Sequence, residues 1–415
     1  MSRRAWWGVL VGIAVLIAVL VWARLWFVRW IADEERHAGA QRVLAVVRAA
    51  ASAPRADAAQ APAFAPSGAP GAEQIELCGG RWFTLNPDGS ADNDAFERAI
   101  GLPDARAAMM SALRTDPSEY ARAVAMRLAM ADSAQAGENL DALVRLATTT
   151  TDPRVYALAF GACGKGSPGA AGVCRLLNAP QWARLDPGNA APWISVLGAA
   201  VVQHDAPGQV EALYHIAHSA RQDDRFLALT AEVLAHLPSD DTALPATLAL
   251  TVEAAGLDAA QVLPAYQNLT QMCRGAALDD ANRREACSGA AELLFSQADT
   301  LIAARIGGVI GRQLGWPAER LDQARGESTA YLQSTLVKDP AAPRNACTDM
   351  RQSLTEFQSR ARLGEAGAVR DWVARSGLQP EDFIRIERDE RAQRAAEAAS
   401  AASAAAAASA ASAPR

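Results

Sequence analysis

The hydrophobic pattern divides the chain into one continuous apolar run and a long body with helical periodicity. Residues 5–23 contain no charged side chain, and about 20 mostly apolar residues suffice for a helix to cross a bilayer. Indole rings favour the headgroup level of a membrane, and tryptophans flank this run on both sides: Trp6, Trp7, Trp22, Trp26 and Trp30. We therefore expect residues 1–32 to be a single N-terminal membrane anchor, inserted in the lipid bilayer through residues 5–23.

A cleaved signal peptide is the alternative for this segment. The apolar region of a signal peptide usually has about 7–15 residues and is soon followed by a small-residue cleavage site. The nearest such site here, at residues 38–40, comes only after the charged stretch 33–36. The length of the run and its flanks favour an uncleaved anchor.

The remainder of the chain has three parts. Residues 33–75 combine a helical extension with a tract rich in Ala, Pro, Ser and Gly, which predicts a stalk because it has too few large apolar side chains for a core. Residues 391–415 are almost wholly Ala and Ser and predict a low-complexity tail. Between them, residues 76–390 predict one folded domain. Turn residues around an apolar and aromatic run at 75–89 predict a short strand or hairpin, and later apolar positions have helical period.

A repeated Asp-Pro sequence organises the body. It occurs at residues 116–117, 152–153 and 186–187, and a related Asp-Asp sequence follows at 223–224. An Asp at the N-cap accepts hydrogen bonds from free backbone N–H groups, and Pro is favoured at the first helical position. Each occurrence therefore predicts the start of a unit of two helices, with a spacing typical of stacked helical hairpins.

The third unit resembles a tetratricopeptide repeat. The residues that carry the resemblance are Trp193, then Leu197 and Gly198, then Ala212. The family has its Leu-Gly three residues after the Trp, whereas Leu197 follows Trp193 by four, and the neighbouring units lack these residues. The resemblance implies a right-handed stack of helix pairs with a concave face, and it implies no ligand. A generic Ala-rich helical bundle is the alternative.

The expected fold class is thus all-α. It comprises a helix-pair repeat body, similar to an α-solenoid, with one short N-terminal β-strand or hairpin, behind a single transmembrane helix.

All six cysteines follow the predicted anchor. Two pairs bracket short loops and the remaining two are far apart in sequence, so the favoured pairs are Cys163 with Cys174, Cys273 with Cys287, and Cys78 with Cys347. Fifteen pairings are possible for six cysteines. The even number and the bracketed loops favour an oxidising compartment. Reduced thiols in a cytosolic domain, or a zinc site, are the alternatives, although no two cysteines have the short spacing that zinc sites favour.

The cysteines also decide the expected orientation, because the positive charges flanking the apolar run are nearly balanced. We expect the N-terminus in the cytoplasm, the anchor in the inner membrane and the body in the periplasm. The formal net charge of the whole chain is −6, and the body without residues 1–32 is more acidic still. This charge argues against nucleic acid as a partner.

Candidate chemistry is sparse. Glu211, His215 and His218 share a predicted helical face but lack the His-Glu-x-x-His order of zinc proteases. The Gly-x-Gly-x-x-Gly string at 164–169 follows a helix rather than the strand that a dinucleotide site needs. The aspartates at 88, 92 and 94 lack EF-hand spacing. We therefore predict no catalytic, cofactor-binding or metal-binding residues. Gly307, Gly311 and Gly315 lie four apart and predict close helix packing.

These observations predict a single-pass, membrane-anchored helical interaction or scaffold protein of the bacterial cell envelope, without catalytic activity, with a protein or peptide partner in the envelope. The alternative is a membrane-anchored envelope enzyme, such as a cell-wall or peptide hydrolase, because catalytic residues can be far apart in sequence. A deep cleft holding His215 or His218 beside a carboxylate would favour the enzyme.

Overall fold

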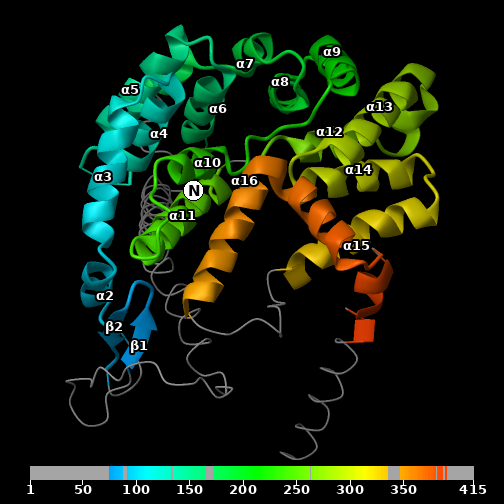
Figure 1. The fold of residues 1–415 in the computed structure, drawn as a ribbon. Coiled ribbons are helices and arrows are strands. Elements are labelled where there is room, and N and C mark those ends of the chain that lie inside the picture. Colours follow the sequence, from blue (N-terminus) through cyan, green and yellow to red (C-terminus); the bar gives the residue numbers. More distant parts are fainter. Residues whose placement is uncertain are drawn as a thin grey trace, which may run out of the picture. The chain divides into compact units, whose positions relative to one another are not determined.

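The computed structural model describes residues 74–86, 91–131, 134–164, 172–261, 263–334, 346–379, 381–386 and 388–389. These residues are mostly helical and include one two-stranded antiparallel hairpin, as predicted (Figure 1). The predicted anchor at 5–23, the stalk up to residue 73 and the tail from residue 391 lie outside the described residues. Within the ranges described, no helix combines the length and the apolar character needed to cross a membrane.

The chain folds into two compact units whose segments alternate along the sequence. Of the described residues, unit 1 contains those up to Thr115, those in Glu232–Ala259 and those in Pro343–Phe357; unit 2 contains those in Asp116–Ala231, those in Ala260–Ala342 and those from Gln358 to 389. This division is finer than the domain of residues 76–390, which stays a prediction.

Unit 1 begins with the hairpin of β1 (Gln74–Leu77) and β2 (Arg81–Thr84), paired so that Ile75 lies opposite Phe83. Gly79 and Gly80 form the turn with φ of 76° and 73°, a conformation that side chains with a Cβ rarely adopt. Ile75 and Phe83 are buried, and the Phe83 ring meets the Phe96 ring edge to face, with centroids 5.2 Å apart. The hairpin thereby packs against α2 (Asn93–Ala99).

The remainder of unit 1 is helical. It contains α3 (Leu102–Thr115), the end of α10 (Ala228–Ala235), α11 (Leu244–Ala259) and the first part of α16 (Ala346–Ser376). An ion pair of 2.6 Å between Arg106 Nη1 and Glu253 Oε1 joins α3 to α11. A second ion pair of the same length, between Arg351 Nη2 and Asp241 Oδ2, ties α16 to the segment that precedes α11. The Arg351–Asp241 pair is exposed and contributes little stability, whereas Arg106–Glu253 is half-buried.

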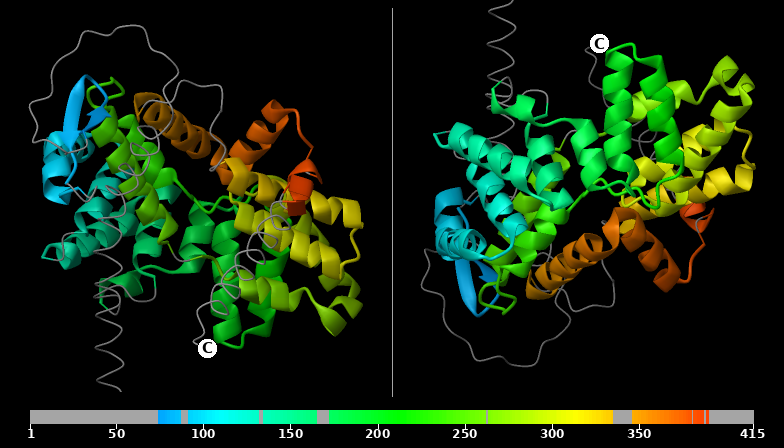
Figure 2. Two further views of the ribbon diagram at one scale, coloured as in Figure 1. Left: turned by 90° about the horizontal axis from the view of Figure 1, so that it is seen from below. Right: turned by 90° about the horizontal axis from the view of Figure 1, so that it is seen from above.

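Unit 2 contains the remaining helices. They are α4 (Glu119–Ala129), α5 (Ala136–Thr149), α6 (Pro153–Ala162), α7 (Ala179–Leu185), α8 (Ala190–Val202), α9 (Ala206–Ala217), α12 (Tyr266–Met272), α13 (Ala281–Gln297), α14 (Leu301–Gln313), α15 (Ala318–Ser334) and the end of α16, with 3-10 turns η1 (Val173–Leu176) and η2 (Gly275–Asp279). Helix α4 packs on α5 and α5 on α6, whereas α8 packs on α9, α9 on α13, and α13 on α14 (Figures 1 and 2).

The repeated Asp-Pro sequences start helices in only one of three places as expected. Asp152 caps α6 by accepting from the Arg154 N–H, with Pro153 in the first turn. At the other two sites a neighbouring residue takes this role: Ser118 caps α4 and Asn189 caps α8. Asp186 instead ends α7. The fourth expected start is wrong, because residues 219–227 run without helix before α10.

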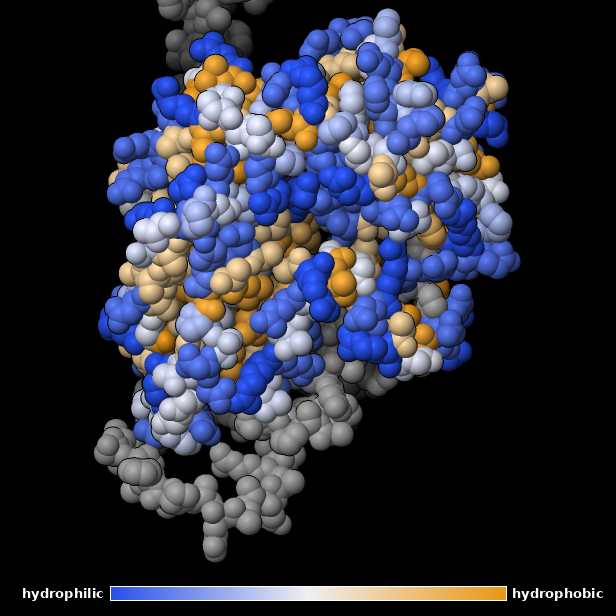
Figure 3. Space-filling view, turned by 45° about the horizontal axis from the view of Figure 1, so that its top comes forward, coloured by the Kyte–Doolittle hydropathy of each residue, from blue (hydrophilic) through white to orange (hydrophobic). Residues whose placement is uncertain are grey.

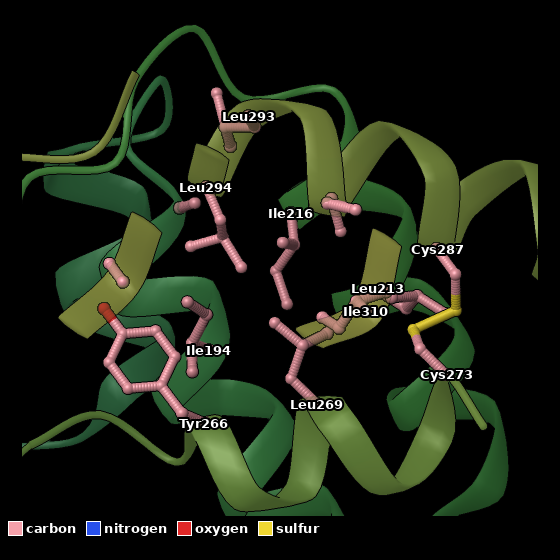
Figure 4. Close-up of a cluster of buried hydrophobic side chains, with 14 of the residues drawn as sticks. Ile194, Leu213, Ile216, Tyr266, Leu269, Cys273, Cys287, Leu293, Leu294 and Ile310 are labelled. Carbon is pink, nitrogen blue, oxygen red and sulfur yellow. A yellow bond between two sulfur atoms is a disulfide. The ribbon is translucent and has the colours of Figure 1, made fainter. Parts of the chain in front are cut away.

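The core of unit 2 is an apolar cluster contributed by α8, α9, α12, α13 and α14. Figure 4 shows Ile216 and Leu269 facing each other near its middle, with the Cys273–Cys287 sulfurs at one edge. The Tyr266 ring packs near Ile194, and its hydroxyl lies at the opposite edge of the cluster (Figure 4). The Tyr266 hydroxyl thus lies at the edge of the core, where it can donate a hydrogen bond to polar groups outside the cluster.

The cysteines lie in the three pairs favoured by the sequence. The Cα atoms are 5.1 Å apart for Cys78 and Cys347, and 5.6 Å apart both for Cys163 with Cys174 and for Cys273 with Cys287. These separations are normal for disulfides. The first pair joins the β1–β2 turn to α16 within unit 1, and the other two close loops within unit 2.

Four of the five tryptophans in residues 76–390 pack against apolar neighbours, whereas Trp82 on β2 is exposed. Trp182 is buried and its ring lies 5.5 Å from that of Phe160. Trp193, Trp316 and Trp372 are half-buried at the edges of core clusters.

Candidate functional site

The outer face of the α8–α9 hairpin exposes large apolar side chains. Val202 at the end of α8 is 76% exposed, and Val210 and Tyr214 on α9 are 57% and 55% exposed. Val210 and Tyr214 are four residues apart and so lie on one face of the helix. Elsewhere hydrophilic residues predominate on the face drawn in Figure 3, interrupted by groups of hydrophobic residues. Single exposed apolar residues are normal, so the neighbouring rings decide whether this face is special.

Two ring stacks adjoin these side chains. The Trp193 ring of α8 lies on the His215 ring of α9 with centroids 3.8 Å apart and an interplanar angle of 11°. The Tyr214 ring lies on the His218 ring at 4.1 Å and 28°. The His218 Nδ1 is 2.8 Å from the Tyr214 carbonyl oxygen; since a carbonyl only accepts, Nδ1 carries the proton in this tautomer. The stacks hold four rings in fixed positions across two helices.

Local sequence explains why the hairpin forms. Asp205 caps α9, because its carboxylate accepts from the Gly208 N–H at 3.1 Å. His204 has φ of 56°, a left-handed conformation that reverses the chain between α8 and α9. The close helix spacing then brings Trp193 and His215 into contact. We name Val202, Val210 and the four stacked rings, which include Tyr214, the aromatic–imidazole face.

The structure describes only some of the other residues that the sequence suggested for metal or phosphate binding. The described ranges contain no group of three or more His, Cys, Asp or Glu side chains that could hold a metal. Asp92 caps α2 by accepting from the Ala95 N–H, and Asp94 lies in its first turn. Asp88 and most of the Gly-x-Gly-x-x-Gly string lie outside the described residues.

A network of polar side chains surrounds residues 221–225 in unit 2. The sequence did not indicate it as a site. The Asn189 side chain binds this segment with both ends of its amide: its Nδ2 donates to the Asp223 carbonyl oxygen at 2.9 Å, and its Oδ1 accepts from the Asp223 N–H at 3.0 Å. Asp186, also buried, receives the guanidinium groups of Arg221 and Arg225. Asp223 pairs with Arg225 at 2.8 Å.

Asp224, which is half-buried, belongs to the same network. Its Oδ2 accepts from the Tyr266 hydroxyl at 2.6 Å, and its Oδ1 accepts from Gln222 Nε2 at 2.7 Å. Its backbone N–H donates to Asp299 Oδ1 at 3.1 Å. The segment also bonds by its backbone to the α13–α14 junction, where the Asp299 N–H donates to the Gln222 carbonyl oxygen at 3.0 Å. We name residues 221–225 with their partners the carboxyl network.

Burial changes the acidity of this network. The pKa of Asp224 rises to about 6, chiefly because the surrounding protein disfavours its charged form, although the Tyr266 hydrogen bond opposes this rise. The pKa of Asp299 also lies well above its ordinary value, because of burial first and of the nearby Asp224 and Asp223 charges next. Burial and the Asp224 charge raise the pKa of Tyr266 above its usual value. Such shifts occur at functional sites and also in structural networks.

A sequence signal for the network was available only in part. The adjacent acids at 223–224 predict a helix start, and Asp299 belongs to no recognisable motif. Their meeting requires the fold, since residues 224 and 299 are separated by α10, α11, α12 and α13 along the chain. No family model, curated protein or solved structure matches this chain.

Proposed function

We propose that this protein is a non-catalytic interaction module of the bacterial envelope, tethered by residues 5–23, whose aromatic–imidazole face binds a protein or peptide partner. The observation that carries the proposal is the exposure of Tyr214 and Val210 beside two pre-formed ring stacks. Aromatic side chains supply much of the binding energy at protein interfaces, and rings already held in place lose little conformational entropy on binding.

The arrangement of helices supports the same proposal. Helices α4, α6 and α8 begin at Glu119, Pro153 and Ala190, close to the spacing of the sequence repeat, and each is followed by a second helix, α5, α7 and α9. Stacked helix pairs of this kind, as in α-solenoids, present extended surfaces for partners. The pair α8–α9 corresponds to the unit that resembles a tetratricopeptide repeat.

An oxidising location for the body is part of the proposal. The three cysteine pairs at disulfide-bonding separation support it, because such bonds persist outside the cytosol and are rare within it. With the N-terminus in the cytoplasm and the anchor in the inner membrane, unit 2 would face partners in the periplasm.

The enzyme alternative gains less support. The feature that would favour it is a deep cleft that holds His215 or His218 beside a carboxylate, and here the rings of these two histidines lie on Trp193 and Tyr214. Asp224 has both carboxylate oxygens engaged by side chains of its own network. The two histidine rings pack against aromatic rings, and the Asp224 carboxylate hydrogen-bonds to Gln222 and Tyr266, so these contacts favour a structural role over a catalytic one.

Site-specific photo-crosslinking in living cells tests the proposed surface. A photoreactive phenylalanine analogue replaces Tyr214 in the full-length chain, and the same analogue replaces Trp82 on β2 as a control of equal exposure, since both side chains are 55% exposed. We expect a discrete adduct of one mass from position 214 and none of that mass from position 82.

A second variant keeps the experiment specific to the surface. With the photoreactive residue at Val210, the added substitution Tyr214→Ala should abolish the adduct while leaving thermal unfolding almost unchanged, because exposed positions contribute little to stability. Identical adducts from positions 214 and 82, or a Val210 adduct that survives Tyr214→Ala, would refute the proposal.

A further inference from the structure

The pair Cys78–Cys347 differs from the other two cysteine pairs in how far apart its members are in sequence. They are separated by 269 residues, whereas the members of the other pairs are separated by 11 and 14 residues. Cys78 is also the first cysteine of the chain and Cys347 is the last, so the long pair encloses both short pairs.

The division of the chain into units explains why the long pair forms late. Both short pairs lie within unit 2, whereas Cys78 and Cys347 lie in unit 1, whose described residues come from three segments: the chain up to Thr115, Glu232–Ala259 and Pro343–Phe357. Cys347 is the second residue of α16 and belongs to the last of these segments. Unit 1 can therefore be completed only after most of the chain is present.

The native surroundings of Cys78 depend on the same late segment. The Cys78 side chain is fully buried, and its Sγ lies 3.9 Å from the Sδ of Met350 on α16. Met350 and Leu354 are themselves buried, so this part of α16 packs into unit 1. Before α16 is present, we expect the Cys78 thiol to be accessible to the cysteines that precede α16, because accessible thiols react with other sulfurs.

The statistics of an unfolded chain favour wrong partners for both members of the long pair. The probability that two residues meet falls roughly as the 3/2 power of their separation. The separation of Cys78 from Cys163 is about a third of its separation from Cys347, so Cys78 meets Cys163 about 5 times as often. Cys287 is closer still to Cys347, at less than a quarter of that separation. Chain statistics therefore make the native partner of Cys78 the least favoured one.

We propose that this protein is a substrate of a disulfide isomerase, a protein whose reactive thiol exchanges with mispaired cysteines until Cys78 pairs with Cys347. The inference rests on the oxidising location in the proposed function, because wrong pairs form where thiols are oxidised. With the N-terminus in the cytoplasm, the body would cross the membrane from its N-terminal end, so Cys78 meets oxidants before Cys347 does. The inference does not depend on the aromatic–imidazole face.

The exchange requires a thiolate and no net oxidant. One mispaired chain has the bonds Cys78–Cys163 and Cys174–Cys347. The isomerase thiolate attacks the sulfur of Cys163, forms a mixed disulfide with it and releases the Cys78 thiolate. The Cys78 thiolate attacks the sulfur of Cys347 and releases the Cys174 thiolate. The Cys174 thiolate then attacks the sulfur of Cys163 and releases the isomerase thiolate. Two wrong disulfides become two native ones, and no electron or proton is gained or lost.

Oxidative refolding of the full-length chain in detergent micelles tests the inference. The reduced chain is diluted into a glutathione buffer with or without a purified disulfide isomerase that has a Cys-x-x-Cys site. Acid stops the exchange, and peptide mapping quantifies each cysteine pair. We expect the isomerase to raise the initial rate of Cys78–Cys347 formation at least ~5-fold, the factor by which chain statistics favour Cys163 as the partner of Cys78.

The double variant Cys78→Ser with Cys347→Ser is the matched control, because it keeps only the two short pairs. These pairs should form at the same rate with and without the isomerase, since short loops close rapidly. An isomerase effect on the control as large as that on the parent chain would overturn the inference. Formation of Cys78–Cys347 at equal rates with and without the isomerase would also overturn it.

Alkylation of intact cells separates this inference from the proposed location. Six cysteines that label fully without reductant would contradict the oxidising location and the inference together. Cysteines that are paired in cells, in a chain that refolds without the isomerase, would overturn the inference alone. Failure of the Tyr214 photo-crosslink would contradict the proposed partner surface and leave the cysteine pairing unaffected.

Discussion

Replacing Gly307 with alanine tests the close contact between α13 and α14. A Cβ atom at Gly307 would lie 2.6 Å from the Phe295 backbone nitrogen and 2.8 Å from the Ala291 carbonyl oxygen. Both neighbours are backbone atoms of α13, so neither can rotate away as a flexible side chain could. The helices would have to move apart by about 1 Å to restore ordinary van der Waals distances.

The expected cost comes from two opposing effects. Overpacking of a well-packed core costs about 1–3 kcal/mol. Alanine offsets part of this, because its helix propensity exceeds that of glycine by about 1 kcal/mol. Since the clash is with backbone atoms, we expect an overpacking cost of about 3 kcal/mol, the upper end of this range. The gain in helix propensity of about 1 kcal/mol leaves a net destabilisation of unit 2 of about 2 kcal/mol for Gly307→Ala. For a body of this size that lowers Tm by roughly 4–8 °C.

Thermal unfolding followed by circular dichroism measures the effect, with Gly137→Ala as the matched control. Gly137 is also a helical glycine of unit 2, but a Cβ there would meet nothing within 4 Å, so this change should raise stability by about 0.5 kcal/mol. Equal Tm values for the two variants would refute the close approach of α13 and α14. Hydrogen exchange should localise the loss of protection to these two helices.

Two further substitutions test other parts of unit 2. Replacing Cys273 and Cys287 together by serine should lower the free energy of unfolding by about 3 kcal/mol, which urea unfolding measures. Alkylation of intact cells with and without reductant shows whether the disulfide forms in vivo. Full labelling of both thiols without reductant would contradict the disulfide. Tyr266→Phe removes the hydroxyl bonded to Asp224 and should cost about 1.5–3 kcal/mol, whereas Tyr214→Phe, at an exposed ring, should change the free energy of unfolding by less than about 0.5 kcal/mol. Equal urea midpoints for these two tyrosine variants would show that the buried hydroxyl does not stabilise the network.

The three glycines of α14 and its C-terminus show how far a spacing pattern can be interpreted. The sequence predicts close packing at Gly307, Gly311 and Gly315 alike. The structure gives each a different role: Gly307 faces the α13 backbone, Gly311 makes room for the Trp316 ring, and Gly315 has φ of 83° with open space around it. Spacing indicates that a small residue is required, and only the neighbours show why.

Sequence alone determined the features that depend on nearby residues. Helical periodicity, the glycine turn between β1 and β2, and the Asp152 cap of α6 arise from contacts within a few positions, so their signals are local. The choice of cap at α8 involves distant residues. Asp186 and Asn189 can both cap a helix; Asn189 caps α8, and the Asp186 carboxylate pairs with Arg221 and Arg225 from a distant segment.

Tertiary structure alone decided which segments meet. Helix α9 packs on α13 although α10, α11 and α12 intervene in sequence, and Asp224 reaches Asp299 across the same interval. Such pairings depend on which apolar faces can be buried together, and no single segment encodes them. The raised pKa values of Asp224 and Asp299 depend on the same burial, so only the folded chain shows them.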